Sequence, residues 1–123
     1  MPHLTLEYSA NLAEPDLPRL FTSIHEALAT LGIALDDCRS RARRCETYRV
    51  GTGAPERAFV HLTLAILDRR PPETQRAAGE LAFGVLQEAF AATALDCDVT
   101  VEVREMRTSS YFKTRVPAPA VRP

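Results

Sequence analysis

Residues 3–6, His3-Leu4-Thr5-Leu6, return unchanged as His61-Leu62-Thr63-Leu64. In both copies leucine alternates with a polar residue, which is typical of a strand that buries one face. Four matching residues can coincide by chance, so the segments that follow each copy decide whether the chain repeats. Each copy leads into an amphipathic helix and then into another strand. The sequence therefore predicts two units of the same kind.

The first copy continues through a loop, Ser9 to Pro15, into a helix. Asp16 is suited to cap its first turn, and Pro18 fits within that turn. The apolar stripe of this helix consists of Leu17, Leu20, Phe21, Ile24, Leu28 and Leu31. Gly32 is placed to end the helix in a left-handed conformation. A second strand is expected from about Arg39 to Val50.

The second copy continues through residues 68–72 into another helix. Its apolar stripe consists of Ala77, Ala78, Leu81, Val85, Leu86, Ala89 and Phe90. The last strand is expected from about Asp98 to Glu105, because Val99, Val101 and Val103 alternate with polar residues. A glycine-rich turn, residues 51–53, joins the two units.

These segments predict an α+β fold in which two tandem β-α-β units, about 2–50 and 58–105, share a four-stranded sheet within one domain of residues 1–116. Right-handed crossovers place both helices on the same face of that sheet. The other face then carries His3, Thr5, Glu7, His61 and Thr63 without a cover. An uncovered face in so small a domain favours association, and a ring of three subunits would cover it.

Composition limits the function. The 123 residues carry a net charge of −1, so no overall field favours nucleic acid or an anionic membrane as partner. The three cysteines, Cys38, Cys45 and Cys97, have no C-x-x-C spacing, which favours reduced thiols over a disulfide framework or a zinc site. No signal-like or membrane-length apolar run is found, and we expect a cytoplasmic protein.

Proline follows the initiator methionine directly. Aminopeptidases generally remove a methionine that precedes a small residue, and Pro2 would then carry a free secondary amine. An α-amino group titrates near pH 8, and burial or nearby cations lower that pKa further. Such an amine is suited to act as a base near neutral pH. An ordinary processed terminus is the alternative, because many chains begin with Met-Pro.

Several arginines are placed to bind an anion. Arg39, Arg41 and Arg43 alternate along the second strand and so project from one face. For Arg41 and Arg43 we favour ion pairs with acidic residues of neighbouring chains, whereas Arg39, at the strand's start, is as well suited to a ligand. Arg70 precedes a helix N-terminus, where it could hold a carboxylate in a bidentate fork or simply be solvated.

The histidines add no separate chemistry at this point. His3, His25 and His61 lack the spacing of metal ligands. His3 and His61 occupy equivalent positions in the two units, which indicates a packing or interfacial role. No metal and no nucleotide cofactor is expected, and the chemistry is limited to what a base and anion-binding groups can do.

Pro2 at the head of a strand, the doubled β-α-β unit, and arginines at the second strand and after the third resemble the tautomerase superfamily. Within it the chain is most similar to the 5-carboxymethyl-2-hydroxymuconate isomerase family. The matching stretches are Pro2-His3 with Glu7 and Ser9, Asp16-Leu17-Pro18 with Leu20-Phe21, Arg39-Ser40-Arg41, residues 58–64, and Phe112-Lys113.

The resemblance implies a homotrimeric, cofactor-free isomerase of aromatic-compound catabolism, acting in homoprotocatechuate degradation. It makes Pro2 the base, gives Arg39 a catalytic role, and assigns Arg70 and Phe112 to substrate binding. The substrate would be a dienol with several carboxylates, and Pro2 would return its proton to a distant carbon. Two segments depart from the family: residues 67–71 replace a glycine-rich loop, and the proline-rich tail, 117–123, differs and is expected to be disordered.

Two other functions remain open from the sequence. One is a hydratase or dehalogenase of the same superfamily, in which a protonated Pro2 acts as an acid and Glu7 or Glu105 activates water. The other is a non-catalytic trimer that serves as a binding module, which would follow if Met1 stayed attached to Pro2. The ionisation state of the Pro2 amine separates the first alternative from the isomerase.

Overall fold

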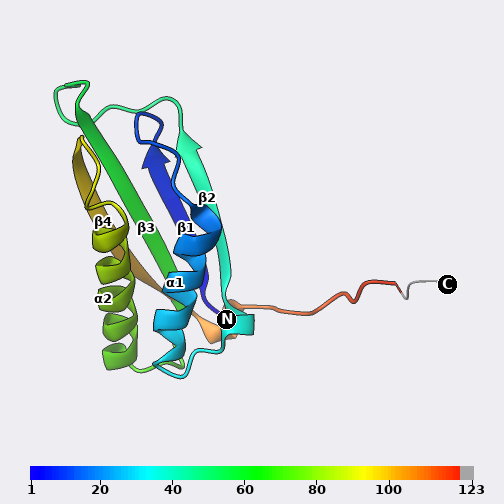
Figure 1. Ribbon diagram of the computed structural model, residues 1–123. Helices are drawn as coiled ribbons and strands as arrows, with labels where there is room; N and C mark the ends of the chain where they lie inside the picture. The colour runs from blue at the N-terminus through cyan, green and yellow to red at the C-terminus, as the bar shows by residue number, and fades with distance from the viewer. Residues whose placement is uncertain (120–123) are drawn as a thin grey trace.

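Two β-α-β units contribute their strands to a single sheet, as Figure 1 shows. The computed structural model describes residues 1–119. The first unit comprises β1 (His3–Ser9), α1 (Leu17–Ala29) and β2 (Arg39–Cys45), with the short 3-10 helix η1 (Leu35–Asp37) before β2. The second comprises β3 (Arg57–Leu67), α2 (Pro72–Ala89) and β4 (Asp96–Met106), followed by a second 3-10 helix, η2 (Thr108–Ser110). The predicted α+β arrangement is confirmed.

The strands lie in the order β2-β1-β3-β4. Each unit forms a parallel pair, and the two pairs join through antiparallel β1 and β3. Because the repeated strands run in opposite directions, His3 lies opposite Ala65, whereas His61 lies opposite Glu7. The two histidines are equivalent in the repeat but occupy different places on the sheet.

Pairing partners set the strand lengths. The expectation that the second strand reaches Val50 was wrong: β2 ends at Cys45, where its register with β1 ends at Ser9. Residues 46–56 instead form a loop in which Gly51 and Gly53 have positive φ angles of 54° and 89°. The last strand is longer than expected, because it pairs with the full length of β3.

The start of α1 is set by the predicted local signals, and its end lies slightly earlier than expected. The Asp16 carboxylate accepts a hydrogen bond from the backbone N–H of Arg19 at 3.2 Å, and Pro18 lies in the first turn. Gly32 has a φ of 84° in the turn that follows the helix. The start of the helix is therefore as predicted, whereas the helix ends at Ala29 with Thr30 as its C-cap, before Leu31 and Gly32.

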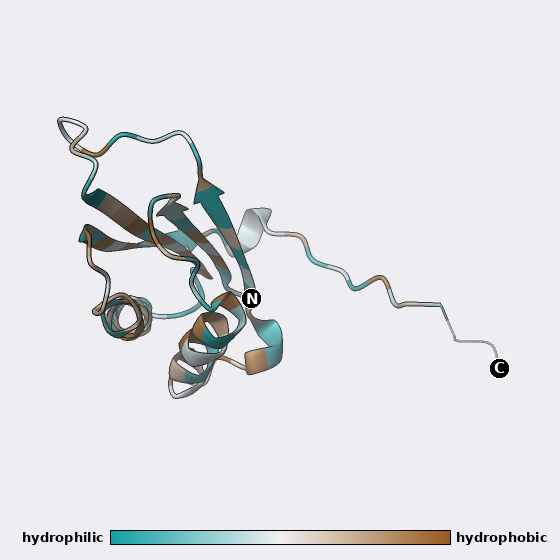
Figure 2. Ribbon diagram, turned by 45° about the horizontal axis from the view of Figure 1, so that its top comes forward, coloured by the Kyte–Doolittle hydropathy of each residue, from teal (hydrophilic) through white to brown (hydrophobic). Residues whose placement is uncertain are grey.

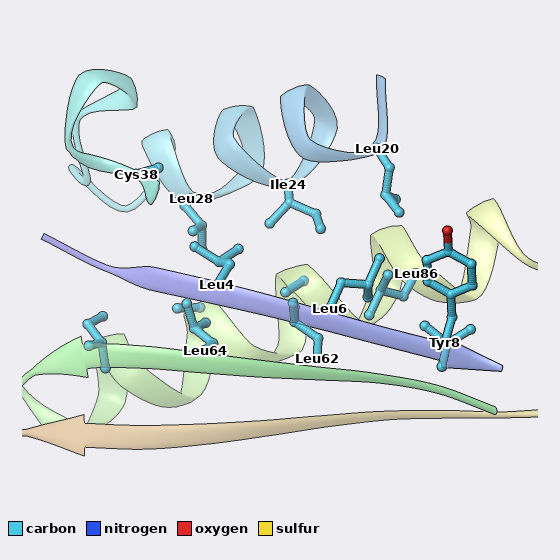
Figure 3. Close-up of a cluster of buried hydrophobic side chains, with 14 of the residues drawn as sticks. Leu4, Leu6, Tyr8, Leu20, Ile24, Leu28, Cys38, Leu62, Leu64 and Leu86 are labelled. Carbon is cyan, nitrogen blue, oxygen red and sulfur yellow. The ribbon is translucent and has the colours of Figure 1, made fainter. Parts of the chain in front are cut away.

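Both helices cover the same face of the sheet, as Figures 1 and 2 show. The four leucines of the repeat, Leu4, Leu6, Leu62 and Leu64, are fully buried on that face. Figure 3 shows them facing Ile24 and Leu28 of α1 and Leu86 of α2. Burial of one such side chain contributes about 1.5–3 kcal/mol, so the repeat itself supplies much of the core.

The α2 helix approaches β4 closely, and this changes its predicted stripe. Gly79 and Ala82 are buried where no buried residue was expected, whereas Ala89 is exposed. A Cβ atom on Gly79 would lie 2.6 Å from Cγ2 of Val103. Small residues therefore line this contact because a larger side chain would push the helix away from the sheet.

Neither α1 nor α2 covers the opposite face of the sheet (Figure 2). Arg41 and Arg43 are exposed on β2 at one edge, and Asp98 and Glu102 are exposed on β4 at the other. The face is thus basic at one edge and acidic at the other. Within residues 1–119 no helix is long and apolar enough to cross a bilayer.

The described part of the proline-rich tail, residues 117–119, is exposed and has no regular structure. It leads away from the sheet in Figure 1. Residues 120–123 lie outside the described residues. The single-domain boundary at 116 and disorder of the tail over 117–123 stay predictions.

Candidate active site

Parallel pairing of β1 and β2 brings Pro2 and Arg39 together. Pro2 is buried just before β1, and its carbonyl accepts a hydrogen bond from the backbone N–H of Arg39 at 3.1 Å. The next residue, His3, is the register partner of Arg39. Two of the predicted site residues therefore meet at the same end of the sheet.

A cavity of about 510 Å³ opens beside this pair. Its lining comprises Met1, Asp36, Asp37, Arg39, Lys113, Thr114 and Arg115. These residues come from three places in the chain: the N-terminus, the approach to β2, and the segment after η2. The site is therefore assembled from parts of the chain that are distant in sequence.

The Arg39 guanidinium is fixed against the backbone. Its Nη1 donates to the carbonyl oxygens of Asp36 at 2.6 Å and Cys38 at 3.1 Å. Arg39 forms no ion pair with any other part of residues 1–119. Arg39 is thus held at the cavity wall without an ion pair, although Asp36 and Asp37 line the same cavity.

The environment of the N-terminus favours an uncharged amine. Burial lowers the pKa of the Met1 amino group, and the cation of Arg69 lowers it further. Asp37 acts in the opposite direction, whereas Lys113 and Arg70 again lower that pKa. Because like charges disfavour a further positive charge, an amine at this end of the sheet is held towards neutrality.

The loop after β3 carries Arg69 and Arg70, and neither lines the cavity, so the substrate-binding role of Arg70 stays a prediction. Arg69 acts on the terminal amine more strongly than Arg70 does. Arg70 is half-buried, and its carbonyl accepts a hydrogen bond from Nε2 of Gln75 at 2.9 Å. We expected only Arg70, because its place beside the helix N-terminus was the local signal.

Phe112 does not line the cavity within one subunit. Its side chain is 90% exposed. Its neighbours do take part: Lys113 lines the cavity, and the hydroxyl of Tyr111 lies 2.9 Å from Nε2 of His3. Sequence reasoning assigned no role to either residue. The available signals were that Lys113 is the only lysine in the chain and that Phe112-Lys113 matches the family.

Arg41 contacts His3 within its own chain, and its expected ion pair with a carboxylate of a neighbouring chain stays a prediction. Its Nη2 lies 3.0 Å from Nδ1 of His3. Burial lowers the pKa of His3, and the charge of Arg41 lowers it further, so the ring is neutral near pH 7. Since a guanidinium only donates, Nδ1 accepts, and Nε2 donates its proton to the Tyr111 hydroxyl.

The other histidines lie elsewhere. His25 on α1 is half-buried, and its Nε2 lies 2.6 Å from the Ser40 hydroxyl on the covered face of the sheet. His61 lies on the uncovered face, with Nδ1 2.7 Å from the Thr100 hydroxyl and Nε2 3.9 Å from the Glu102 carboxylate. Neither histidine lines the cavity beside Pro2.

A larger hollow of about 920 Å³ lies at the other end of the molecule, between the start of α1 and the end of α2. Its charged lining residues are Glu14, Asp16, Glu88 and Arg19. This excess of carboxylates disfavours an anionic ligand. We therefore place the candidate site at the smaller cavity beside Pro2, where the cations Arg39, Lys113 and Arg115 outnumber the carboxylates Asp36 and Asp37.

Solved structures with the same architecture define the class of protein. A 5-carboxymethyl-2-hydroxymuconate isomerase from Deinococcus radiodurans R1 is 32% identical and superposes with a TM-score of 0.86, covering 94% of this chain and 90% of its own. A fused 4-OT symmetric trimer, only 13% identical, shares the fold at a TM-score of 0.67, with 87% of each chain covered. The fold is that of the tautomerase superfamily.

The sequence comparisons are more specific. The 5-carboxymethyl-2-hydroxymuconate isomerase family model matches residues 2–116. The chain is also 35% identical over 117 residues to 5-carboxymethyl-2-hydroxymuconate Delta-isomerase of Escherichia coli, covering 92% of this chain and 93% of that protein. The chain belongs to the 5-carboxymethyl-2-hydroxymuconate isomerase family.

Proposed function

We propose that the protein isomerises a 2-hydroxymuconate-type dienol, 5-carboxymethyl-2-hydroxymuconate, to its conjugated keto form without a cofactor. The observation that carries this proposal is the placement of buried Pro2 against Arg39, beside a cavity with several further cations. The Escherichia coli relative is named for this isomerisation, and the family assignment supports the same substrate class.

Pro2 is the base in this proposal, and it requires removal of Met1. While methionine is attached, the Pro2 nitrogen is part of an amide and binds no proton. Met1 lines the cavity, so its removal would both free the secondary amine and clear space for a substrate beside it. The burial and cations that lower the pKa of the present terminus would act on the prolyl amine as well.

The reaction moves one proton. The neutral prolyl nitrogen takes the proton of the 2-hydroxyl and returns it to a distant carbon of the diene, which leaves a ketone at the former hydroxyl carbon. Negative charge spreads along the conjugated system between these two steps. Arg39 and Arg70 bind the carboxylates and stabilise that charge, and Arg69 adds to the local positive field.

The oligomeric state and the setting belong to the same proposal. A homotrimer would cover the uncovered sheet face, and a neighbour of the same fold is described as a symmetric trimer. Phe112, exposed in one subunit, would then contact the substrate or an adjoining subunit. We place the enzyme in the cytoplasm, in homoprotocatechuate degradation.

The two carboxylates named for the hydratase alternative, Glu7 and Glu105, find little support in the geometry. That reaction needs a carboxylate or a histidine beside Pro2 to activate water. Glu7 lies five residues along β1, which at about 3.3 Å per residue is roughly 16 Å from Pro2. Glu105 accepts a hydrogen bond from Gln75 of α2 at 2.8 Å, on the helix-covered side of the sheet. Neither carboxylate lines the cavity, whereas Asp36 and Asp37 do. The ionisation state of the Pro2 amine separates a hydratase that would use them from the isomerase.

The test is ultraviolet monitoring of ketonisation of 5-carboxymethyl-2-hydroxymuconate, or of the simpler 2-hydroxymuconate. Pro2→Ala keeps a primary amine and should lose part of the rate. Arg39→Ala should lose about 100-fold or more in kcat/KM, because it removes a preorganised cation from the developing charge. Arg76→Ala is the matched control, since Arg76 lies exposed on α2 beside Glu80. Unchanged kinetics in both site variants would overturn the proposal.

A further inference from the structure

We propose that Lys113 is a further substrate-binding cation of this site and that Tyr111 and His3 are the residues that position it. The inference rests on the proposed function, because it names a ligand of the same polycarboxylate. It concerns the segment of residues 107–115, called here the C-terminal segment, which follows β4 and passes the N-terminus of the chain (Figure 1).

Two contacts tie the C-terminal segment to the sheet end. At the first, the Asp68 carboxylate accepts hydrogen bonds from the backbone N–H and the hydroxyl of Thr108. These bonds lower the pKa of Asp68, which keeps it charged. At the second, Tyr111 meets His3 edge-to-face, with ring centroids 6.0 Å apart, as well as through their hydrogen bond. The segment is thus held at the first residue of η2 and at the residue that follows η2.

The hydrogen bond between His3 and Tyr111 has a defined donor and acceptor. Arg41 occupies Nδ1 of His3, so the ring proton lies on Nε2 and points to the Tyr111 hydroxyl. His3 follows Pro2 directly in the chain. The position of Tyr111 is therefore set relative to the proposed base, and Lys113 follows two residues later.

Lys113 lines the cavity together with Met1 and Arg39, and its charge acts on the terminal amine. It forms no ion pair among residues 1–119, whereas Arg115, which also lines the cavity, lies 3.7 Å from the Asp36 carboxylate. Of the two cavity-lining cations of this segment, Lys113 is therefore the one without an ion pair among residues 1–119.

A lysine suits this position chemically. The proposed substrate carries three carboxylates, and Arg39 and Arg70 can each bind one. The ammonium group is a compact charge on a flexible stem, so it can follow a mobile carboxymethyl arm rather than hold a fixed plane. Because Lys113 is exposed, salt should screen its attraction for the substrate.

The kinetic test compares Lys113→Met, Lys113→Arg and the control Arg76→Met. Lys113→Met should raise KM about three- to tenfold and change kcat little, as expected for an exposed charge that binds ground and transition states alike. Lys113→Arg should restore most of the affinity, and high salt should reduce the difference from wild type. A KM within about twofold of wild type at low salt would overturn the role of Lys113 and leave the proposed function intact.

A binding test needs no turnover. Muconate has two carboxylates and no 2-hydroxyl, so it can occupy the site without reacting. In a chain processed at Met1, Lys113 and the prolyl terminus are the only amines, and acetylation of each can be followed by peptide mass spectrometry. Muconate should protect Lys113 from acetylation in the wild type and much less in Arg39→Ala. Full acetylation of Lys113 at saturating muconate would contradict the inference, even if the protein proved inactive on the dienol.

Positioning by Tyr111 is tested with a double-mutant cycle. Tyr111→Phe removes the hydroxyl that accepts from His3 and should raise KM in the same direction as Lys113→Met. If Tyr111 acts through Lys113, the double variant should show little more than the single lysine variant does. Fully multiplicative effects would show that Tyr111 does not position Lys113, and unfolding curves would identify a loss that is merely structural.

Discussion

At the scale of single residues, the sequence indicated Pro2 and Arg39 because both depend on local signals. Proline after the initiator methionine and an arginine at a strand start can be found without knowing the fold. Tyr111 and Lys113 could not be found in this way. Tyr111 contacts His3 across 108 positions of sequence, and only the path of the chain after β4 brings the two together.

His3 gives a prediction about pH and stability. Its pKa is lowered in the folded protein from an ordinary value of 6.5 by burial and by Arg41, so the unfolded chain binds this proton more readily. The contribution of His3 to the free energy of unfolding is therefore present above about pH 6.5 and is lost as the pH falls through the lowered pKa. Burial lowers the pKa of His25 in the same direction.

The measurement is the urea midpoint at about pH 7.5 and about pH 5.5, at one protein concentration, for wild type, His3→Gln, His25→Gln and the double variant. Each single substitution should reduce the loss of stability on acidification, and the double variant should reduce it most. An unchanged pH dependence in the double variant would show that other groups control acid stability.

At the scale of elements, the repeat predicted the order of helices and strands but not their lengths. The stripe of α1 could be read from spacing, because large apolar residues mark it. The buried face of α2 could not be predicted in this way. Its buried residues are small, and they are buried because the helix packs closely against β4. The ends of the strands could not be predicted from the sequence either, because each strand ends where its partner strand ends.

Two glycines of α2 test this account of the helix. Gly79→Ala should lower the free energy of unfolding by about 1–3 kcal/mol, because the new Cβ would meet Val103 at 2.6 Å. Gly84→Ala is the matched control: among residues 1–119 nothing lies within 4 Å of the place its new Cβ would take, so alanine should stabilise the helix by about 0.5–1 kcal/mol. Equal stabilisation by both substitutions in urea unfolding would contradict the close approach of α2 to β4.

At the scale of the whole molecule, the sheet face that neither α1 nor α2 covers has no second layer packed on it within residues 1–119 of a single chain. Across its middle, Arg41, Thr5, Thr63 and Glu102 form one row from the basic edge to the acidic edge. Such a face would bring opposite charges of adjoining copies together in a ring. The proposed trimer would therefore bury the threonines and pair the edges.

Thr63→Arg tests that arrangement. Native mass spectrometry should give three times 13.6 kDa for the unprocessed wild-type chain and a single chain for the variant, because like charges would meet around the ring axis. Gln87→Arg, on an exposed position of α2, should remain trimeric. Circular dichroism would check that the variant is folded. A monomeric wild type, or a folded Thr63→Arg protein that stays trimeric, would overturn the proposed use of this face.

The central claim is that a neutral Pro2 amine is the base, and the pH dependence of kcat/KM tests it most directly. Intact-mass spectrometry on the same sample would record whether Met1 is absent. We predict a methionine-free protein whose kcat/KM for ketonisation rises with pH through an apparent pKa below 8.0, the ordinary value for a terminal amine. Full turnover by protein that retains Met1 would contradict the account, because its Pro2 nitrogen would be an amide.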